Sequence, residues 1–308
     1  MKVAFVFPGQ GAQYAGMGRE ISEKFSDARA AFAEADAALD FPISRLCFEG
    51  PEEELKLTEN TQPAILTMST AVFRILEGKG IRPDFVAGHS VGEYSALVAA
   101  GAIKLGDAAA LVRKRGRYMQ EAVPVGEGAM AALVGLDLPV VQSICERAAE
   151  GQVVSPANLN SPGQIVIAGN REAVERAVVL AKEARARMAV LLKVSAPFHC
   201  ALLKPAENRL SVDLDRCAVR ELRYPVVTNV DAAVIRTGAD ARSALKRQVS
   251  RPVRWHESMQ RLLDEGVRTF VEVGPGKVLL GLIRSIDKSV TMLNAEDEKS
   301  VENVLSAL

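Results

Sequence analysis

The chain has 308 residues, 48% of them hydrophobic and 25% charged, which is enough for one large domain, or a large domain with an insert, around a substantial core. Lys plus Arg number 38, as do Asp plus Glu, and this balance argues against a nucleic-acid or membrane-surface partner. The four cysteines are scattered without a Cys-x-x-Cys pair, which indicates a reduced cytoplasmic setting and neither a disulfide framework nor a metal site. No apolar run reaches the ~18 residues of a membrane span, and the N-terminal run is too short for a signal peptide.

The first part of the chain predicts strands that alternate with helices. An apolar run at 3–7 predicts a buried strand that ends at the Gly-rich stretch 8–11. That stretch lacks the Gly-Lys-Ser/Thr of a phosphate-binding loop, so we do not expect nucleotide binding. Helical spacing follows at 21–39, at 61–76 with Pro63 in its first turn, and at 105–121, with a strand–turn–helix unit at 85–100.

The pattern of predicted strands and helices changes at residues 124–128. The segments that follow predict the order strand, helix, strand, strand, helix, strand, which is the split βαβ order of a ferredoxin-like unit. These segments are 129–134, 138–150, 153–157, 164–168, 171–185 and 188–194. We therefore expect residues 127–195 to form a small inserted ferredoxin-like (βαββαβ) subdomain.

After residue 195 the alternation of the first part resumes. We expect a helix that opens at 197–199, a strand at 226–229, helices at 240–249 and 255–265, a strand at 269–273 and a helix at 277–285. Strands that alternate with helices predict an α/β fold with a mainly parallel sheet covered on both faces.

The segment Gly88-His89-Ser90-Val91-Gly92 lies between an apolar strand and an apolar helix, as in a Gly-x-Ser-x-Gly nucleophile elbow. A serine on so sharp a turn has a strained backbone, and side chains two residues to either side would collide, which explains the two glycines. The helix directs its N-terminal N–H groups toward a developing oxyanion. A plain strand-to-helix turn is the alternative. The pattern favours Ser90 as the nucleophile of a large α/β-hydrolase-like domain made of residues 1–126 and 196–308.

A serine nucleophile needs a base, and the chain has three histidines. His89 is adjacent to Ser90 and should point to the opposite side of the chain. His256 lies on a predicted amphipathic helix, where packing explains it. His199 lies where the small subdomain rejoins the large domain, and we prefer it as the base.

No acidic residue stands out as the third member of a triad. Asp107 and Asp137 occur at apparent helix starts, where capping explains them. A backbone carbonyl can orient a histidine in place of a carboxylate.

Six short motifs occur in order along the chain. They are Phe7-Pro8-Gly9-Gln10-Gly11, Gly88-His89-Ser90-Val91-Gly92-Glu93, Arg115-Gly116 with Met119-Gln120, Asn158-x-Asn160-Ser161-Pro162-x-Gln164, Pro197-Phe198-His199, and Glu272-x-Gly274-Pro275-Gly276-Lys277. Together they resemble the bacterial malonyl-CoA:acyl-carrier-protein transacylases, the loading acyltransferases of type II fatty acid synthesis. The resemblance covers about residues 3–285.

The resemblance implies a role for each matching residue. Ser90 would carry the malonyl ester, His199 would be its base, and the main-chain carbonyl of Gln248 would orient that histidine. Gln10 and the Val91 N–H would form the oxyanion hole.

Selectivity is implied for two further residues. Arg115 would bind the malonyl carboxylate through the parallel N–H groups of its planar guanidinium. On sequence alone Arg113 is an equal candidate. Phe198 would crowd an α-methyl branch, with simple core packing as its alternative. Asn158, Asn160 and Gln164 match the motif but are also explained as caps of the turn at 161–163.

The resemblance further implies a ping-pong transfer of malonyl from malonyl-CoA to the phosphopantetheine thiol of acyl carrier protein, through a malonyl-serine ester and without a cofactor. The expected partners are malonyl-CoA and holo-acyl carrier protein, and we expect a cytoplasmic monomer. An acidic carrier protein would meet a basic rim, with candidates Arg113, Lys114, Arg117, Lys182, Arg185 and Arg187. A serine esterase and a non-catalytic carrier-binding module are the alternatives. An esterase would need an acidic residue as the third member of a triad, and Arg115 would have no role in it. A non-catalytic binding module would not need a serine with a strained backbone.

Overall fold

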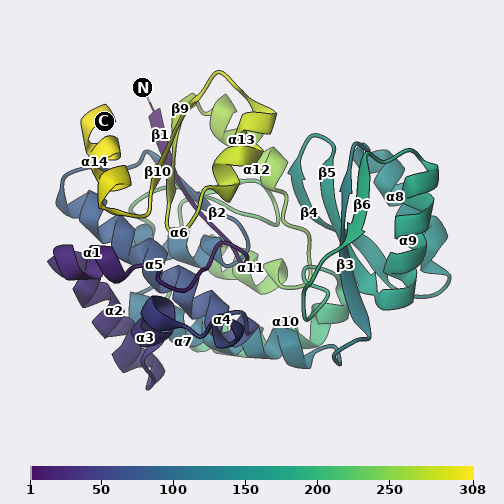
Figure 1. Ribbon diagram of the computed structural model, residues 1–308, viewed down its shortest axis with the longest axis horizontal. Helices are drawn as coiled ribbons and strands as arrows, with labels where there is room; N and C mark the ends of the chain where they lie inside the picture. The colour runs from purple at the N-terminus through teal and green to yellow at the C-terminus, as the bar shows by residue number, and fades with distance from the viewer. Residues whose placement is uncertain (1) are drawn as a thin grey trace.

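Two β-sheets organise the computed structural model, which describes residues 2–308 (Figure 1). Sheet A contains, in spatial order, β10 (Thr291–Ala295), β9 (Val267–Val273), β1 (Lys2–Phe7), β2 (Phe85–Gly88), β7 (Val226–Val227) and β8 (Val234–Ile235). Neighbouring strands run parallel except for the pair β7 and β8, which is antiparallel. The predicted α/β fold with a mainly parallel sheet is confirmed.

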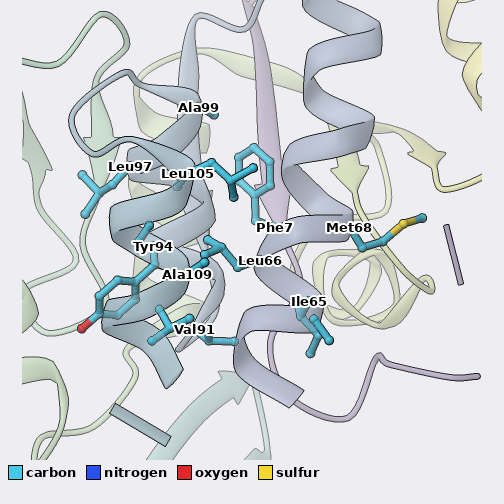
Figure 2. Close-up of a cluster of buried hydrophobic side chains, with 14 of the residues drawn as sticks. Phe7, Ile65, Leu66, Met68, Val91, Tyr94, Leu97, Ala99, Leu105 and Ala109 are labelled. Atoms are coloured by element: carbon cyan, nitrogen blue, oxygen red, sulfur yellow. The ribbon is translucent and has the colours of Figure 1, made fainter. Parts of the chain in front are cut away.

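Helices pack on both faces of sheet A, because its central strand β1 is apolar on both sides. Phe5 and Phe7 belong to one buried cluster, and Ala4 and Val6 belong to another. The first cluster includes residues of α5 (Thr58–Gly78), α6 (Gly92–Ala99) and α7 (Leu105–Glu121), and the second includes residues of α12 (Trp255–Asp264) and α13 (Val278–Ile286). Figure 2 shows Phe7 among the apolar side chains of the first cluster. This packing fixes the carboxyl end of β2, from which Ser90 projects.

Sheet B is antiparallel and has the order β4-β5-β3-β6. Its elements are β3 (Gly128–Val134), α8 (Leu138–Ala149), β4 (Val154–Ser161), β5 (Gln164–Asn170), α9 (Arg171–Glu183) and β6 (Met188–Leu191). The chain order βαββαβ is the one expected, and it forms the right-hand part of Figure 1. Alternate residues of β3 pack against α8 and α9. Sheet B lies within residues 128–191, and the division of the chain at 126/127 and 195/196 stays a prediction.

The edge strand β4 joins sheet B to the rest of the molecule. The Leu159 N–H donates to the Val253 carbonyl at 2.8 Å, and the Val253 N–H donates to the Ala157 carbonyl at 2.8 Å. This places β4 beside the segment that leads into α12, so residues of β4 face the carboxyl ends of the sheet A strands.

Several predicted boundaries are wrong. The helix expected at 21–39 is two helices, α1 (Arg19–Lys24) and α2 (Ser26–Leu39), because Phe25 between them is extended. Helix α5 begins at Thr58, so Pro63 lies inside it and not in its first turn. The motif 197–199 is a turn and does not open a helix, since the next helical turn is η1 (Ala201–Leu203).

Several short or polar elements were not predicted. These are α3 (Ile43–Glu49), α4 (Glu52–Leu55), β8, β10 and α14 (Glu298–Ala307). The helix expected from 197–199 is α10 (Lys204–Arg216), which begins later. The predicted helix at 240–249 is α11 (Gly238–Gln248). None of the helices in residues 2–308 is both long and apolar enough to cross a membrane.

Candidate active site

Ser90 occupies a sharp turn between β2 and α6 and has the left-handed backbone conformation, with φ of 54°. A Cβ on Gly88 would lie 1.9 Å from the carbonyl carbon of Gly92. A Cβ on Gly92 would lie 2.1 Å from the carbonyl oxygen of Phe7. Both glycines are therefore required by close backbone approach, as the elbow interpretation predicts.

His199 lies directly against Ser90, with 2.7 Å between His199 Nε2 and Ser90 Oγ. The other ring nitrogen, Nδ1, is 2.9 Å from the main-chain carbonyl oxygen of Gln248. A carbonyl can only accept, so Nδ1 carries the proton and Nε2 is left to accept from Ser90. His199 has a positive φ of 60°, and left-handed backbone of this kind is held at a site only by the surrounding structure.

The environment keeps His199 neutral. The residue is 3% exposed, and burial together with the positive charge of Arg115 lowers the pKa of His199 to about 3. At neutral pH the ring is therefore free to accept a proton from Ser90.

Arg115 is buried beside the same serine, at 1% exposure. Its Nη1 donates to Gln62 Oε1 at 2.7 Å. Its Nη2 donates to Gln248 Oε1 at 2.9 Å and to Ser90 Oγ at 3.2 Å. All three acceptors are neutral, and no carboxylate within residues 2–308 forms a salt bridge with this guanidinium. The arrangement leaves a buried positive charge available for an incoming carboxylate.

The other basic residues of α7 face elsewhere. Arg113 stacks its guanidinium 4.0 Å from the centre of the Phe41 ring. Lys114 forms an ion pair of 2.7 Å with Asp213, and Arg117 lies on the exposed surface. The structure thus brings Arg115, and not its sequence competitor Arg113, to the serine.

Gln10 and Val91 line the same cavity as Ser90. Gln10 donates from its side-chain Nε2 to Thr58 Oγ1 at 3.4 Å. Across the described residues, the backbone N–H groups of Gln10 and Val91 make no hydrogen bond within the protein. Two donors beside Ser90 are thus free for an oxyanion.

His89 points away from this cluster. Its Nε2 lies 2.9 Å from Asn160 Oδ1, and its ring centre lies 5.5 Å from that of Trp255. Asn158 and Asn160 are strand residues of β4, so the expectation that they cap the 161–163 turn is wrong. The third histidine, His256, is half-buried at the start of α12.

No acid takes the third place of a triad. Both lie at helix starts, as predicted: Asp137 is the N-cap residue of α8, although its side chain makes no capping hydrogen bond, and Asp107 is in the first turn of α7. The residue that meets His199 Nδ1 is the Gln248 carbonyl. Among residues 2–308 no group of three His, Cys, Asp or Glu residues is placed to hold a metal ion.

Three buried polar residues around the site were missed from the sequence. Gln62 binds Arg115, as given above. Asn229 accepts the Ser90 N–H at its Oδ1, at 2.7 Å. Glu93 is 1% exposed, and burial raises the pKa of its carboxyl to about 7. A signal was present for the last two, because Glu93 ends the elbow motif and Asn229 ends a predicted strand of the parallel sheet.

Ser90, His199 and Arg115 line a cavity of about 140 Å³. Phe198, which is 8% exposed, lines it together with residues from sheet B and the segment after it. The lining residues outside the polar cluster include Met119, Met130, Leu192, Val194 and Phe198. A second cavity of about 220 Å³ shares Gln10, His89 and Asn158 with the first. The serine therefore lies in a hollow bounded by both sheets.

Comparison with known proteins agrees with this geometry. Residues 4–305 match the family described as the acyl transferase domain. The malonyl CoA-acyl carrier protein transacylase of Bacillus subtilis (strain 168) is 49% identical over 308 residues, which is 100% of this chain and 97% of that protein. The structure of the malonyl CoA-acyl carrier protein transacylase from Coxiella burnetii has a TM-score of 0.98 and 45% identity, covering 100% of this chain and 98% of that one. A type II PKS acyl-carrier protein in complex with its malonyl-transacylase gives a TM-score of 0.98 and 45% identity, with 100% of both chains covered. With Ser90 hydrogen-bonded to a buried His199 and full-length relatives of this kind, the chain belongs to the acyl transferase family, among the malonyl CoA-acyl carrier protein transacylases.

Proposed function

We propose that this protein transfers the malonyl group of malonyl-CoA to the phosphopantetheine thiol of acyl carrier protein. The observation that supports this most strongly is the convergence at Ser90 Oγ of His199 Nε2 at 2.7 Å and Arg115 Nη2 at 3.2 Å. A nucleophile, a base and a receptor for a carboxylate meet within one hollow. Relatives along the whole chain carry the name of this activity, and one has been solved with its acyl-carrier protein.

The first half of the proposed reaction acylates Ser90. His199 Nε2 takes the proton of Ser90 as Oγ attacks the thioester carbon of malonyl-CoA. The tetrahedral oxyanion accepts hydrogen bonds from the Val91 N–H and from Gln10. When the C–S bond breaks, the imidazolium of His199 returns its proton to the CoA sulfur, and malonyl-Ser90 remains.

Arg115 makes this acylation selective for a diacid. Its neutral acceptors take hydrogen bonds from Nη1 and Nη2, but its buried Nε has no partner and its charge is uncompensated. A malonyl carboxylate therefore gains a charge-assisted, bidentate contact. Phe198 at the cavity wall would crowd an α-methyl branch on the acyl group.

The second half reverses the first with another thiol. His199 takes the proton of the phosphopantetheine thiol, the sulfur attacks malonyl-Ser90, and the serine oxygen leaves and recovers the proton. The overall reaction exchanges one thioester for another, so its balance requires no nucleotide. Water must be kept from the ester for transfer to exceed hydrolysis, and the position of Ser90 within the hollow serves that end.

Intact-mass spectrometry tests the proposal. Mixing the protein with malonyl-CoA in the absence of carrier protein should add the mass of one malonyl group, located by peptide mapping on Ser90. Ser90→Ala should show no addition, and holo-acyl carrier protein should discharge the wild-type adduct. Steady release of CoA without a thiol acceptor would identify a hydrolase instead.

A further inference from the structure

The strained turn at Ser90 is held on both sides by buried amide side chains. The Ser90 N–H donates to Asn229 Oδ1 at 2.7 Å, and Asn229 Nδ2 donates to the Gly88 carbonyl at 2.6 Å. The Ser90 carbonyl accepts from Gln248 Nε2 at 2.9 Å. Both peptide groups of the nucleophile are thus fixed by side chains from α11 and from the segment after β7.

Both of those residues converge on one carboxylate. Glu93 Oε2 accepts from Gln248 Nε2 at 2.7 Å and from the Asn229 main-chain N–H at 3.1 Å. Glu93 lies in the first turn of α6, three residues after the nucleophile, and touches neither His199 nor Ser90 Oγ through its side chain. It therefore plays no part in the reaction steps described above.

The contact with Glu93 decides which way the Gln248 amide faces. The amide nitrogen meets three acceptors, on Ser90, Glu93 and Asn229, and the amide oxygen is left to accept from Arg115 Nη2. A flipped amide would direct its NH₂ group at the guanidinium, donor against donor. Of the three acceptors on the nitrogen side, Glu93 is the only carboxylate.

We propose that Glu93 is a positioning residue, whose Oε2 fixes the orientation of the Gln248 amide and thereby holds both the Ser90 turn and the Arg115 guanidinium. One buried oxygen, through one glutamine, sets the geometry of the nucleophile and of the carboxylate receptor. This role rests on the proposed acyl transfer through Ser90.

Two variants of similar side-chain length separate the accepting oxygen from simple space filling. Glu93→Met fills the volume without an acceptor, whereas Glu93→Gln retains a carbonyl oxygen. We expect Glu93→Met to slow the acylation of Ser90 by malonyl-CoA on the order of 100-fold, because misplacing reacting groups by about 1 Å has an effect of that size. The Glu93→Gln protein should be acylated at least about tenfold faster than the Glu93→Met protein. Equal rates for Glu93→Met and the wild type, or equal losses in the two variants, would overturn the proposal.

A double-mutant cycle shows whether the effect passes through Gln248. Gln248→Met removes the amide but keeps the main-chain carbonyl that binds His199, and should slow acylation about as much as Glu93→Met. Adding Glu93→Met to Gln248→Met should then cost less than about threefold more, because coupled residues are not additive. If the rate losses of the two single variants multiply in the double variant, Glu93 and Gln248 act independently, and the proposal is contradicted. If Glu93→Met does not fold, a Gln248→Met enzyme as fast as the wild type overturns the proposal by itself.

The wild-type reaction separates this inference from the proposed function. If malonyl-CoA leaves wild-type Ser90 unmodified, the proposed function fails, and this role fails with it. If the wild type is acylated and the Glu93→Met protein, with an unchanged melting temperature, is acylated as fast, only the positioning role fails.

Discussion

At the scale of single residues, the site depends on a buried charge without a charged partner. Most buried guanidinium groups are paired with a carboxylate, because an unpaired charge in the interior is costly. Arg115 instead contacts two glutamines and a serine hydroxyl. Burial lowers the pKa of Arg115, while Glu93 beyond Gln248 opposes that effect. A substrate that brings its own carboxylate supplies the missing counter-charge.

Replacing Arg115 should therefore penalise malonyl transfer selectively. Arg115→Ala should lose about 2–5 kcal/mol of transition-state binding for malonyl-CoA, the usual cost of stranding one partner of a buried charge pair, with a much smaller effect on acetyl-CoA. The measurement is kcat/KM for the two thioesters. Arg113→Ala is the matched control, since its side chain stacks on Phe41 away from the serine, and should behave as the wild type. An equal loss with both thioesters would disprove the carboxylate role.

The depressed basicity of His199 predicts an unusual pH profile. An ordinary histidine, with its pKa near 6.5, would be mostly protonated at about pH 5, but burial and Arg115 bring the pKa of His199 to about 3. A protonated Glu93, whose carboxyl has a pKa of about 7, keeps a carbonyl oxygen that accepts from Gln248, so the rate of Ser90 acylation, followed by intact mass, should stay nearly level from about pH 8 to about pH 5. A loss of rate with a midpoint near 6.5 would contradict this prediction.

The same residue should make the fold sensitive to acid. In the unfolded chain the imidazole of His199 has its usual pKa of 6.5, so it binds a proton below that pH. In the folded protein the same ring, with a pKa of about 3, stays neutral until the pH falls to about 3. The unfolded state then binds more protons, so His199 lowers the free energy of unfolding as the pH falls through that window. His199→Gln, which cannot titrate, should lose less stability than the wild type between about pH 6.5 and pH 4 in urea unfolding.

At the scale of elements, the elbow is possible only because two backbones approach closely. Gly92 in α6 lies against the carbonyl of Phe7 in β1, so an added methyl group has no space. Gly9, on the loop after β1, is similarly close to the His89 carbonyl, at 2.6 Å from an added Cβ. The packing of β1, β2 and α6 thus determines where Ser90 projects.

Alanine at two glycines should have opposite effects. Gly92→Ala should lower the free energy of unfolding by about 1–3 kcal/mol or more, as overpacking does, and abolish measurable acylation. Gly281→Ala, in the middle of α13 with nothing within 4 Å of its added Cβ, should raise it by up to ~1 kcal/mol through helix propensity. Urea unfolding of the wild type, Gly92→Ala and Gly281→Ala measures both changes in the free energy of unfolding. A Gly92→Ala protein as stable as the wild type would show that the turn does not need the close approach.

At the scale of the whole molecule, the reactive hollow is made by two sheets that come from different parts of the chain. Sheet A supplies the elbow and the strands beneath it, while β3 and the segment after β6 supply Met130, Leu192 and Val194 on the other wall. The basic residues on the surface of the molecule differ in their pairing. Lys114 is neutralised by Asp213, whereas Lys182, Arg185 and Arg187 are exposed and form no salt bridge within residues 2–308.

We therefore expect an acidic carrier protein to depend on the sheet B residues. Reversing the charge of Lys182, Arg185 and Arg187 to Glu should raise the KM for acyl carrier protein by about tenfold at low salt, and leave acylation by malonyl-CoA unchanged. The same reversal at Arg45, Lys79 and Lys299, exposed elsewhere, is the control. A KM that moves equally in both triple variants would indicate a net-charge effect without a docking site.

The features that could be predicted from the amino-acid sequence are those that depend on local rules. Strand and helix periods gave the parallel α/β sheet and the βαββαβ order, because one residue in two or in 3.6 must face a core. The glycines of the elbow pointed to Ser90, because only a strained turn needs them at that spacing. Short elements such as α3 and β8 were not predicted, because their conformation is set by what they pack against.

Which distant groups meet could not be predicted, because it depends on the folded chain. Arg113 and Arg115 are equal candidates along the chain, and burial of one against Ser90 separates them. The hydrogen bonds among Asn229, Gln248 and Glu93 join residues far apart in sequence. Local patterns mark Glu93 and Asn229 as positions near the elbow, but they do not predict that these residues bind each other. The physical reason is that hydrogen-bond partners of a buried polar group are chosen by the fold that removes water from it, and that fold is a property of the whole chain.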